Sequence, residues 1–262
     1  MPGTRSLLTD SIIETAGLLA ETARTSTMKW FRQPVEVQRK EDATPVTQVD
    51  RETEQSLIDI IQSRHFGHEI IGEELGTIAG SEPWSWIIDP IDGTKSFLCG
   101  KPTFGSLIAL THAGRPVLGI IEMPALEERW TGIAGLPAIH NGKPCKASKR
   151  TALDDAVLLA TTPDMFSEAD WQTFSKVSTA CRFRNFGTDC YGYGLLASGY
   201  VDVVMEASLS PYDYMALIPV VEGAGGIISD WQGNKVDLNS GHQVLACANK
   251  QLHTSVLEII NS

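Results

Sequence analysis

Apolar residues recur at helical spacing in two stretches near the start of the chain. In residues 7–31 the positions that share one face are Leu8, Ile12, Ala16, Leu19 and Ala23. This period predicts one long amphipathic helix, which Pro34 ends because proline lacks an amide hydrogen and fixes its backbone. Residues 50–64 predict a second helix, with Asp50 or a neighbouring residue as its N-terminal cap.

Short apolar runs replace the helical period after residue 64. They predict strands at residues 68–74, 84–90, 104–114, 115–124 and 128–135, with the turn of an antiparallel hairpin at 112–115. Later, predicted strands (155–161, 182–187, 201–206, 225–230, 243–248) alternate with predicted helices (168–180, 191–198, 213–222, 251–260). This order predicts an α+β first half and an α/β second half. We therefore expect two lobes, residues 1–145 and 146–262.

Composition and charge narrow the class of protein. With 42% hydrophobic and 20% charged residues, the 262-residue chain has the composition of a globular protein. Its formal charge of -11 argues against a nucleic-acid-binding surface, which is normally basic. An anionic substrate stays compatible with this charge, because bound cations can reverse the local field.

The cysteine pattern and the lack of long apolar runs indicate in which cellular compartment the protein is expected. The five cysteines are odd in number and form no CxxC pair, which argues against a zinc cluster or a disulfide framework and favours a reducing cytoplasm. The first residues lack the basic start and apolar core of a signal peptide. No window approaches the roughly eighteen apolar residues of a membrane span. We expect a cytoplasmic protein without a membrane or nucleic-acid partner.

The stretch IIDPIDGTKSF at residues 87–97 carries the first chemical signal. Asp89 and Asp92 follow a short apolar run, and two carboxylates this close repel each other unless a cation lies between them. Their hard oxygen atoms suit Mg²⁺ better than zinc. Pro90 and Gly93 favour a sharp turn, after which Thr94 offers a hydroxyl. Taken alone, the stretch fits either a metal-binding turn or an ordinary Asp-rich surface turn.

Two further acidic positions are ambiguous by themselves. Glu73 and Glu74 follow an apolar run, and they fit either a ligand or a solvated loop end. Asp213 stands where a helix is expected to begin, and it fits either a ligand or a first-turn acid stabilised by the helix dipole. The order of these motifs along the chain is more informative than any one of them.

In that order, GEE (72–74), DPIDGTKSF (89–97) and Asp213 before VEGAGG resemble the inositol monophosphatase superfamily of Mg²⁺-dependent, lithium-sensitive phosphatases. The resemblance covers nearly the whole chain, beginning at KEDATPVTQVD (40–50). It implies the layered α-β-α-β-α sandwich of that superfamily, a small phosphomonoester as substrate, and a homodimer.

Within the superfamily, residues 115–132, 187–199 and 201–213 are most similar to the histidinol-phosphate phosphatase branch. One departure is visible, since Tyr212 stands where the superfamily commonly has tryptophan. An aromatic ring is retained, so this departure distinguishes the subfamily and does not indicate lost activity.

Carried over by position, the resemblance implies a site for two or three Mg²⁺ ions. Glu73, Asp89 and the carbonyl of Ile91 would bind the first ion. Asp89, Asp92 and Asp213 would bind a second. Such ions screen the charge of a phosphate monoester, activate water, and hold the attacking and leaving oxygens in line.

The resemblance also implies residues that act on water and phosphate. Thr94 would position the attacking water together with Glu73, and Asp50 would support Thr94. The backbone amides of Gly93 and Thr94 would contact the phosphate, while Glu74 would lie behind the ligands. Direct attack by water is expected, without a phosphoenzyme.

Two carboxylates in the second half of the chain are expected to lie near the leaving group of the substrate. Asp189 in GTDCYGY and Glu206 in VVMEASLSPYD match family positions near the alcohol portion of the substrate. Two carboxylates suit a cationic alcohol such as histidinol, whereas a neutral cyclitol would leave Asp189 desolvated without a charged partner. The alternatives are a helix N-cap for Asp189 and a surface acid at a strand end for Glu206.

The leading hypothesis is hydrolysis of L-histidinol phosphate, a step of histidine biosynthesis. The alternatives are hydrolysis of inositol 1-phosphate or a broad sugar-phosphate activity, and, in a different class, a catalytically silent regulatory protein. The last is disfavoured because no expected ligand is missing. Lys95 fits either a phosphate contact or a solvated side chain. His65 and His68 are expected to have a surface or packing role and not to bind metal. Of Trp84 and Trp86, one is expected in the core and the other at a boundary or subunit interface.

Overall fold

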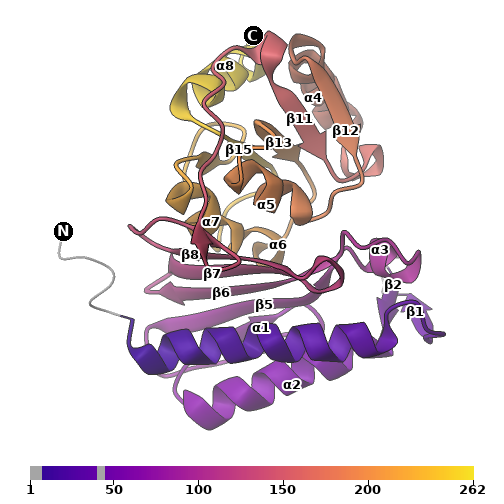
Figure 1. Ribbon diagram of the computed structural model, residues 1–262, viewed down its shortest axis with the longest axis vertical. Helices are drawn as coiled ribbons and strands as arrows, with labels where there is room; N and C mark the ends of the chain where they lie inside the picture. Colours follow the sequence, from indigo (N-terminus) through magenta and orange to yellow (C-terminus); the bar gives the residue numbers. More distant parts are fainter. Residues whose placement is uncertain (1–7, 40–44) are drawn as a thin grey trace.

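The computed structural model of the chain describes residues 8–39 and 45–262, and these form five stacked layers (Figure 1). Two long helices cover an eight-stranded sheet, and short helices lie between this sheet and a five-stranded one. Two more helices cover the outer face of the second sheet. The predicted layered sandwich is confirmed in the described part of the chain. Residues 40–44 of the predicted KEDATPVTQVD motif lie outside it.

The eight-stranded sheet has the spatial order β10-β9-β8-β7-β6-β5-β3-β4. Its strands are β3 (Glu69–Gly72), β4 (Thr77–Ile78), β5 (Trp84–Asp92), β6 (Gly105–His112), β7 (Arg115–Met123), β8 (Glu128–Ile133), β9 (Ile139–His140) and β10 (Lys143–Pro144). Only β3 and β5 run parallel; the other neighbours are antiparallel. The five predicted strands are present, and the predicted hairpin turn joins β6 to β7.

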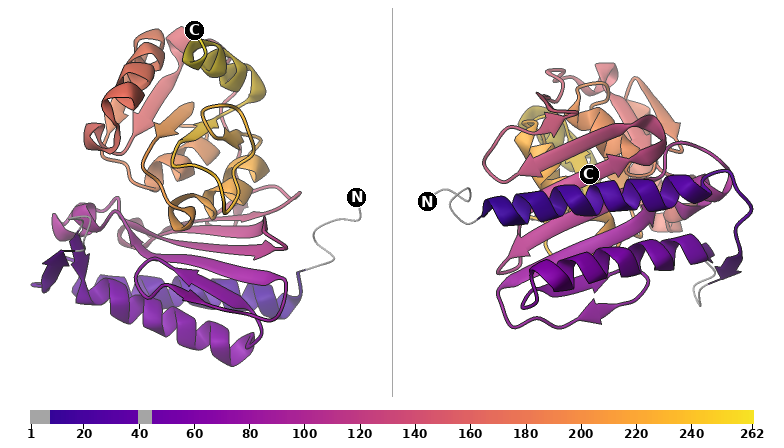
Figure 2. Two further views of the ribbon diagram at one scale, coloured as in Figure 1. Left: turned by 180° about the vertical axis from the view of Figure 1, so that it is seen from behind. Right: turned by 60° about the horizontal axis from the view of Figure 1, so that its bottom comes forward.

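Helices α1 (Asp10–Trp30) and α2 (Gln48–Arg64) lie side by side on one face of this sheet (Figure 2). The predicted apolar stripe of α1 packs against the sheet, and the helix ends before Pro34. Thr47 caps α2, and Asp50 at its third position accepts the Thr47 amide in return. A small ribbon of β1 (Val37–Arg39) and β2 (Pro45–Thr47) precedes α2.

The five-stranded sheet has the order β12-β11-β13-β15-β14. Its strands are β11 (Val157–Ala160), β12 (Phe183–Phe186), β13 (Val203–Glu206), β14 (Ile227–Ser229) and β15 (Val244–Cys247). Helices α4 (Glu168–Ala180) and α8 (Lys250–Ile260) cover its outer face, and α5 (Tyr191–Ala197) packs between the sheets. One apolar core therefore joins the two halves, and the division into lobes 1–145 and 146–262 stays a prediction.

The predicted helix at 213–222 is wrong in one respect, because it is broken in two. The structure has α6 (Pro211–Tyr214) and α7 (Leu217–Gly223), with Met215 and Ala216 between them. Pro219 explains the break: it has no amide hydrogen for the carbonyl of Met215, and its ring would clash with that carbonyl in a continuous helix. Within α7, Pro219 lies in the first turn, where no intrahelical donor is required.

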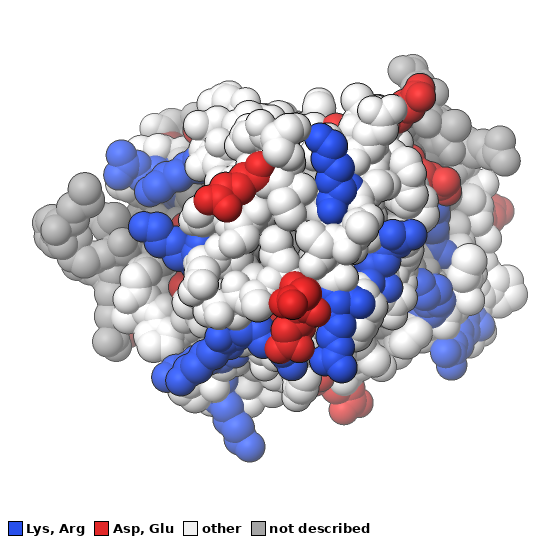
Figure 3. Space-filling model, turned by 90° about the horizontal axis from the view of Figure 1, so that it is seen from above, with Lys and Arg blue, Asp and Glu red and all other residues white. Residues whose placement is uncertain are grey.

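The face formed by α4 and α8 carries a group of basic side chains. Seen from the side of α4 and α8, Lys and Arg side chains gather around a few acidic ones (Figure 3). In this half of the chain Arg150 and Arg182 both form ion pairs with Asp155, and Arg150 also pairs with the buried Asp202. The absence of a nucleic-acid partner stays a prediction. None of the helices in residues 8–39 and 45–262 has the length and hydropathy of a membrane span.

His68 belongs to an aromatic cluster at the start of β3. It is 7% exposed, stacks on His65 and Trp84, and accepts a hydrogen bond from Nε1 of the fully buried Trp86. Because an indole can only donate, Nδ1 of His68 is unprotonated. Burial and the neighbouring His65 lower the pKa of His68 against the opposing effect of Glu82. The predicted packing roles of the histidines and of Trp86 are confirmed.

Acidification is expected to destabilise the protein through His68. The folded state holds His68 neutral, while the unfolded chain takes up a proton near the ordinary pKa of 6.5. The unfolded state then binds more protons, so the free energy of unfolding falls as the pH drops from 6.5 towards the lowered pKa. Thermal unfolding across this range should show a weaker pH dependence for His68→Gln than for the wild type. Identical profiles for wild type and His68→Gln would contradict the assignment.

Candidate metal and phosphate site

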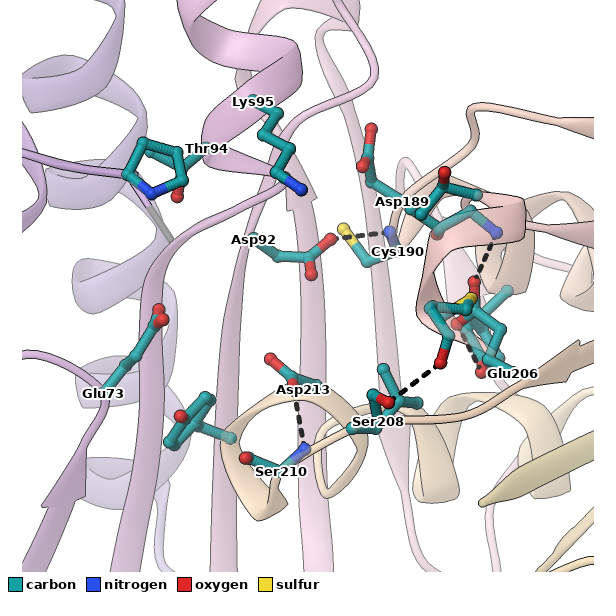
Figure 4. A pocket seen from close by; sticks show the side chains of 18 residues that line it. Glu73, Asp92, Thr94, Lys95, Asp189, Cys190, Glu206, Ser208, Ser210 and Asp213 are labelled. Atoms are coloured by element: carbon teal, nitrogen blue, oxygen red, sulfur yellow. Dashed lines mark hydrogen bonds between the residues drawn. The ribbon is translucent and has the colours of Figure 1, made fainter. Parts of the chain in front are cut away.

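The candidate site is a pocket between the two sheets, with a cavity volume of about 400 Å³. Its charged lining residues come from five segments of the chain (Figure 4): Glu73, Asp92, Lys95, Asp189, Glu206 and Asp213. Thr94, Gly93 and Cys190 also line it. The fold thus brings residues from both predicted lobes to one cavity.

Asp89 and Asp92 point to the same site because the strand that carries them is irregular. In a regular strand, side chains three positions apart face opposite sides of the sheet. The pairing of β5 with β6 shifts register between Asp89 and Asp92, and such a bulge can turn both carboxylates to one side. The predicted strand 84–90 contains Asp89 and ends before Asp92, whereas β5 continues to Asp92 and holds both aspartates in its last four residues.

Asp89, Asp92 and Asp213 form a cluster in which one carboxylate oxygen from each lies within 4.8 Å of the others. Asp213 is the third residue of α6, and its Oδ2 accepts the Ser210 amide at 2.7 Å. The first-turn role and the cluster role are therefore compatible, because the Ser210 amide uses one lone pair of Oδ2 and the carboxylate has others. Asp92 Oδ2 accepts the Cys190 amide at 2.6 Å.

The electrostatics of the cluster favour a bound cation. Burial, followed by the charge of Asp189, raises the pKa of Asp92 to about 7. Burial raises the pKa of Asp89 and of Asp213 well above the ordinary range, and Glu73 adds to the shift at both. Carboxylate groups crowded in this way are stabilised by a divalent ion, and oxygen-only donors suit Mg²⁺. The donor set therefore fits the predicted metal.

Asp50 and Thr94, which are predicted to position the attacking water, lie next to each other. Asp50 is fully buried, its Oδ2 accepts the amide and hydroxyl of Thr47, and its Oδ1 faces the Thr94 hydroxyl at 3.4 Å. The Thr94 hydroxyl also lies 3.2 Å from the carbonyl oxygen of Ile91. The cap of α2 therefore orients one carboxylate oxygen of Asp50 towards Thr94.

Asp189 does not cap a helix, so that alternative is wrong. Cys190 is the residue that precedes α5, and Asp189 has a left-handed backbone with φ of 47°. Its Oδ2 accepts the hydroxyls of Ser96 at 2.6 Å and Thr103 at 2.9 Å. Gly93 is required opposite it, because a Cβ there would lie 2.7 Å from Asp189 Cγ and the φ of Gly93 is +80°.

Glu206 is not a surface acid. It ends β13 at 3% exposure, where Oε1 accepts the Thr161 amide and Oε2 accepts the Tyr193 hydroxyl. Burial raises the pKa of Glu206 against these hydrogen bonds. A carboxylate oxygen can accept two hydrogen bonds, so both oxygens of Glu206 retain capacity for a ligand. In Asp189 that capacity is on Oδ1, because Oδ2 already accepts two hydroxyls.

Sequence reasoning missed several residues of the site. Ser96 and Thr103 hold Asp189, and Glu54 of α2 accepts the amides of Glu74 and Leu75 beside Glu73. The sequence does indicate that Glu54 is buried, since it falls on the apolar stripe of α2 with Leu57 and Ile61. The undecided Lys95 lines the pocket with its amine pointing inward (Figure 4).

The chain resembles known proteins over nearly its whole length. The model of the inositol monophosphatase family matches residues 9–262. The bifunctional phosphatase IMPL2, chloroplastic, of Arabidopsis thaliana is 39% identical over 258 residues, 95% of this chain and 75% of that protein. The histidinol-phosphatase of Chlorobaculum parvum is 33% identical over 247 residues, 93% of this chain and 94% of the relative. A solved inositol monophosphatase from Zymomonas mobilis has a TM-score of 0.87 at 40% identity, covering 95% of this chain and 97% of that one.

Proposed function

Because the chain belongs to the inositol monophosphatase family and is therefore a phosphoric monoester hydrolase, we propose that it hydrolyses L-histidinol phosphate to L-histidinol and phosphate. Mg²⁺ is the proposed cofactor and histidine biosynthesis the proposed pathway. Glu73, Asp89, Asp92, Asp213 and the Ile91 carbonyl are the proposed ligands.

The observation that carries this proposal is the charge of the pocket. Among the described residues that line it, five have carboxylates and only Lys95 has a cationic side chain. Metal ions would balance Glu73, Asp92 and Asp213, while Asp189 and Glu206 lie on the opposite side from Glu73 (Figure 4). Buried carboxylates favour a cationic partner, and histidinol carries an ammonium and an imidazole group.

The chain's own residues orient the reaction. When bound, Mg²⁺ would screen the phosphate and activate water. The Thr94 hydroxyl can donate a hydrogen bond to Asp50, which leaves the hydroxyl oxygen free to accept one from the attacking water beside Glu73. The Gly93 and Thr94 amides are proposed to contact the phosphate. Cys190 lines the pocket, but burial raises its pKa well above the usual range, so the thiol is a poor nucleophile and direct attack by water is favoured.

Inositol 1-phosphate is the second candidate, since the Zymomonas mobilis structure at 40% identity is named an inositol monophosphatase. Asp189→Asn distinguishes the two substrates. The asparagine oxygen can still accept hydrogen bonds from the Ser96 and Thr103 hydroxyls, but the negative charge is lost. We expect kcat/KM for histidinol phosphate to fall about 10- to 100-fold more than kcat/KM for inositol 1-phosphate. This is the effect expected from losing one hydrogen bond to a charged group. Ser96→Ala, which removes one hydrogen bond to Asp189 but keeps the charge of Asp189, should change the ratio of the two kcat/KM values less than Asp189→Asn does. Equal losses for both substrates in Asp189→Asn would contradict the assignment.

Assembly and location are part of the same proposal. A homodimer is proposed from the family resemblance, and sedimentation of the purified chain tests it. The five cysteines are free, which supports a reducing compartment such as the cytoplasm.

A further inference from the structure

Glu54 is a buried carboxylate outside the pocket that contacts the segment carrying Glu73. Its side chain is fully buried, and each oxygen accepts one backbone amide, Oε2 from Glu74 at 2.9 Å and Oε1 from Leu75 at 2.8 Å. A carboxylate suits two converging amide donors, because each of its oxygens can accept one of them and neither oxygen carries a hydrogen.

The loop between β3 and β4 packs directly against the Glu54 carboxylate. The hydrogen bond from the Gly72 amide to the Gly76 carbonyl closes the loop between β3 and β4 at 3.0 Å. A Cβ at Gly72 would lie 2.0 Å from Glu54 Oε1, so any side chain there would displace the carboxylate. Leu75 at the tip is 42% exposed, which means that the loop gains little from apolar burial at this point. The two amides that Glu54 binds belong to the residues directly after Glu73.

Glu54 lies one helical turn after Asp50, on the same buried face of α2. Asp50 reaches Thr94, and Glu54 reaches the loop of Glu73. The two groups expected to act on water therefore rest on one rigid helix, through two buried carboxylates four residues apart.

We propose that Glu54 is a positioning residue, which fixes the loop of residues 73–75 so that the Glu73 carboxylate is held ready for the metal. The inference rests on the proposed function. Without Glu54 the Glu74 and Leu75 amides lose their acceptor, the loop samples other conformations, and Glu73 binds metal only after ordering the loop again. The effect falls on metal binding and turnover, and not on the choice of leaving group at Asp189 and Glu206.

Glu54→Gln tests this, because its amide group would oppose one of the two backbone amides at almost unchanged volume. The matched control is Glu122→Gln, another fully buried glutamate, which pairs with Arg24 and Arg129. Mn²⁺ affinity is measured without substrate, by the electron paramagnetic resonance signal of the free ion, together with Tm and kcat/KM.

For Glu54→Gln we expect about 10- to 100-fold weaker Mn²⁺ binding and a lower kcat, with an unchanged ratio of histidinol phosphate to inositol 1-phosphate hydrolysis. Glu122→Gln should lower Tm and keep the wild-type Mn²⁺ affinity. If Glu54→Gln does not fold, Glu54→Asp, which keeps the charge but shortens the side chain, should show a partial loss of affinity. Wild-type Mn²⁺ affinity in the folded Glu54 variant, or equal losses in the Glu122 control, would overturn the inference. A wild-type enzyme without metal-dependent hydrolysis would instead overturn the proposed function.

Discussion

An Asp92→Asn variant is expected to lose at least about a hundredfold in kcat/KM while folding at least as stably as the wild type without metal. Asparagine can still accept the Cys190 amide, so the local structure is kept, but the charge proposed to bind metal is lost. The pKa of Asp92 is raised to about 7, so the ionised carboxylate destabilises the metal-free fold as the pH rises from 3.8 through 7. The neutral variant lacks this cost, and its Tm at pH 8 should be equal or higher.

The opposite directions of these two effects separate a functional role from a structural one. Phosphate release measures the first, and thermal unfolding in the presence of a chelator measures the second. Asp164→Asn, at an exposed position that does not line the pocket, is the control and should leave both unchanged. Wild-type turnover in Asp92→Asn would refute the catalytic assignment and favour a regulatory protein that only keeps the fold.

Removing the metal is expected to abolish activity and lower Tm. A ligand that binds only the folded state at 100 times its Kd stabilises that state by about 2.7 kcal/mol. For a chain of this size that corresponds to a rise in Tm of about 5 to 10 °C. Mg²⁺ has a further reason to stabilise here, since it relieves the repulsion among Asp89, Asp92 and Asp213.

Differential scanning calorimetry of the protein with a chelator, and then with excess Mg²⁺, measures this gain. The Mg²⁺-dependent rise should be reduced in Asp92→Asn and retained in Asp164→Asn. An equal rise in the two variants would show that Mg²⁺ binds elsewhere on the protein.

Local pattern predicted most of the fold because helices and strands here have clear apolar periods. The break between α6 and α7 was missed, since apolar residues continue through it and only Pro219 marks the first turn of a new helix. The way in which the two halves pack against each other could not be predicted, for a different reason. Helices of the second half bury their apolar faces against both sheets, and such long-range packing leaves no local signal.

The cluster of the candidate site was predicted through the resemblance, but its geometry was not. The bulge that turns Asp89 and Asp92 to one side depends on pairing with β6, which a single strand does not encode. The hydroxyls that hold Asp189 come from Ser96 and Thr103, about ninety residues away in the chain, at separations of 93 and 86. Glu54 differs from the exposed acids Glu52 and Asp59 of α2 only in falling, like Asp50, on the buried face of the helix.

The central claim is that the protein is a Mg²⁺-dependent phosphatase whose acidic pocket favours phosphate esters of a cationic alcohol. It is tested most directly by phosphate release from histidinol phosphate and from inositol 1-phosphate with one preparation of the wild-type protein, with and without Mg²⁺ and with lithium added. We predict hydrolysis that requires Mg²⁺, inhibition by lithium, and a higher kcat/KM for histidinol phosphate. A higher kcat/KM for inositol 1-phosphate would contradict the role given to Asp189 and Glu206.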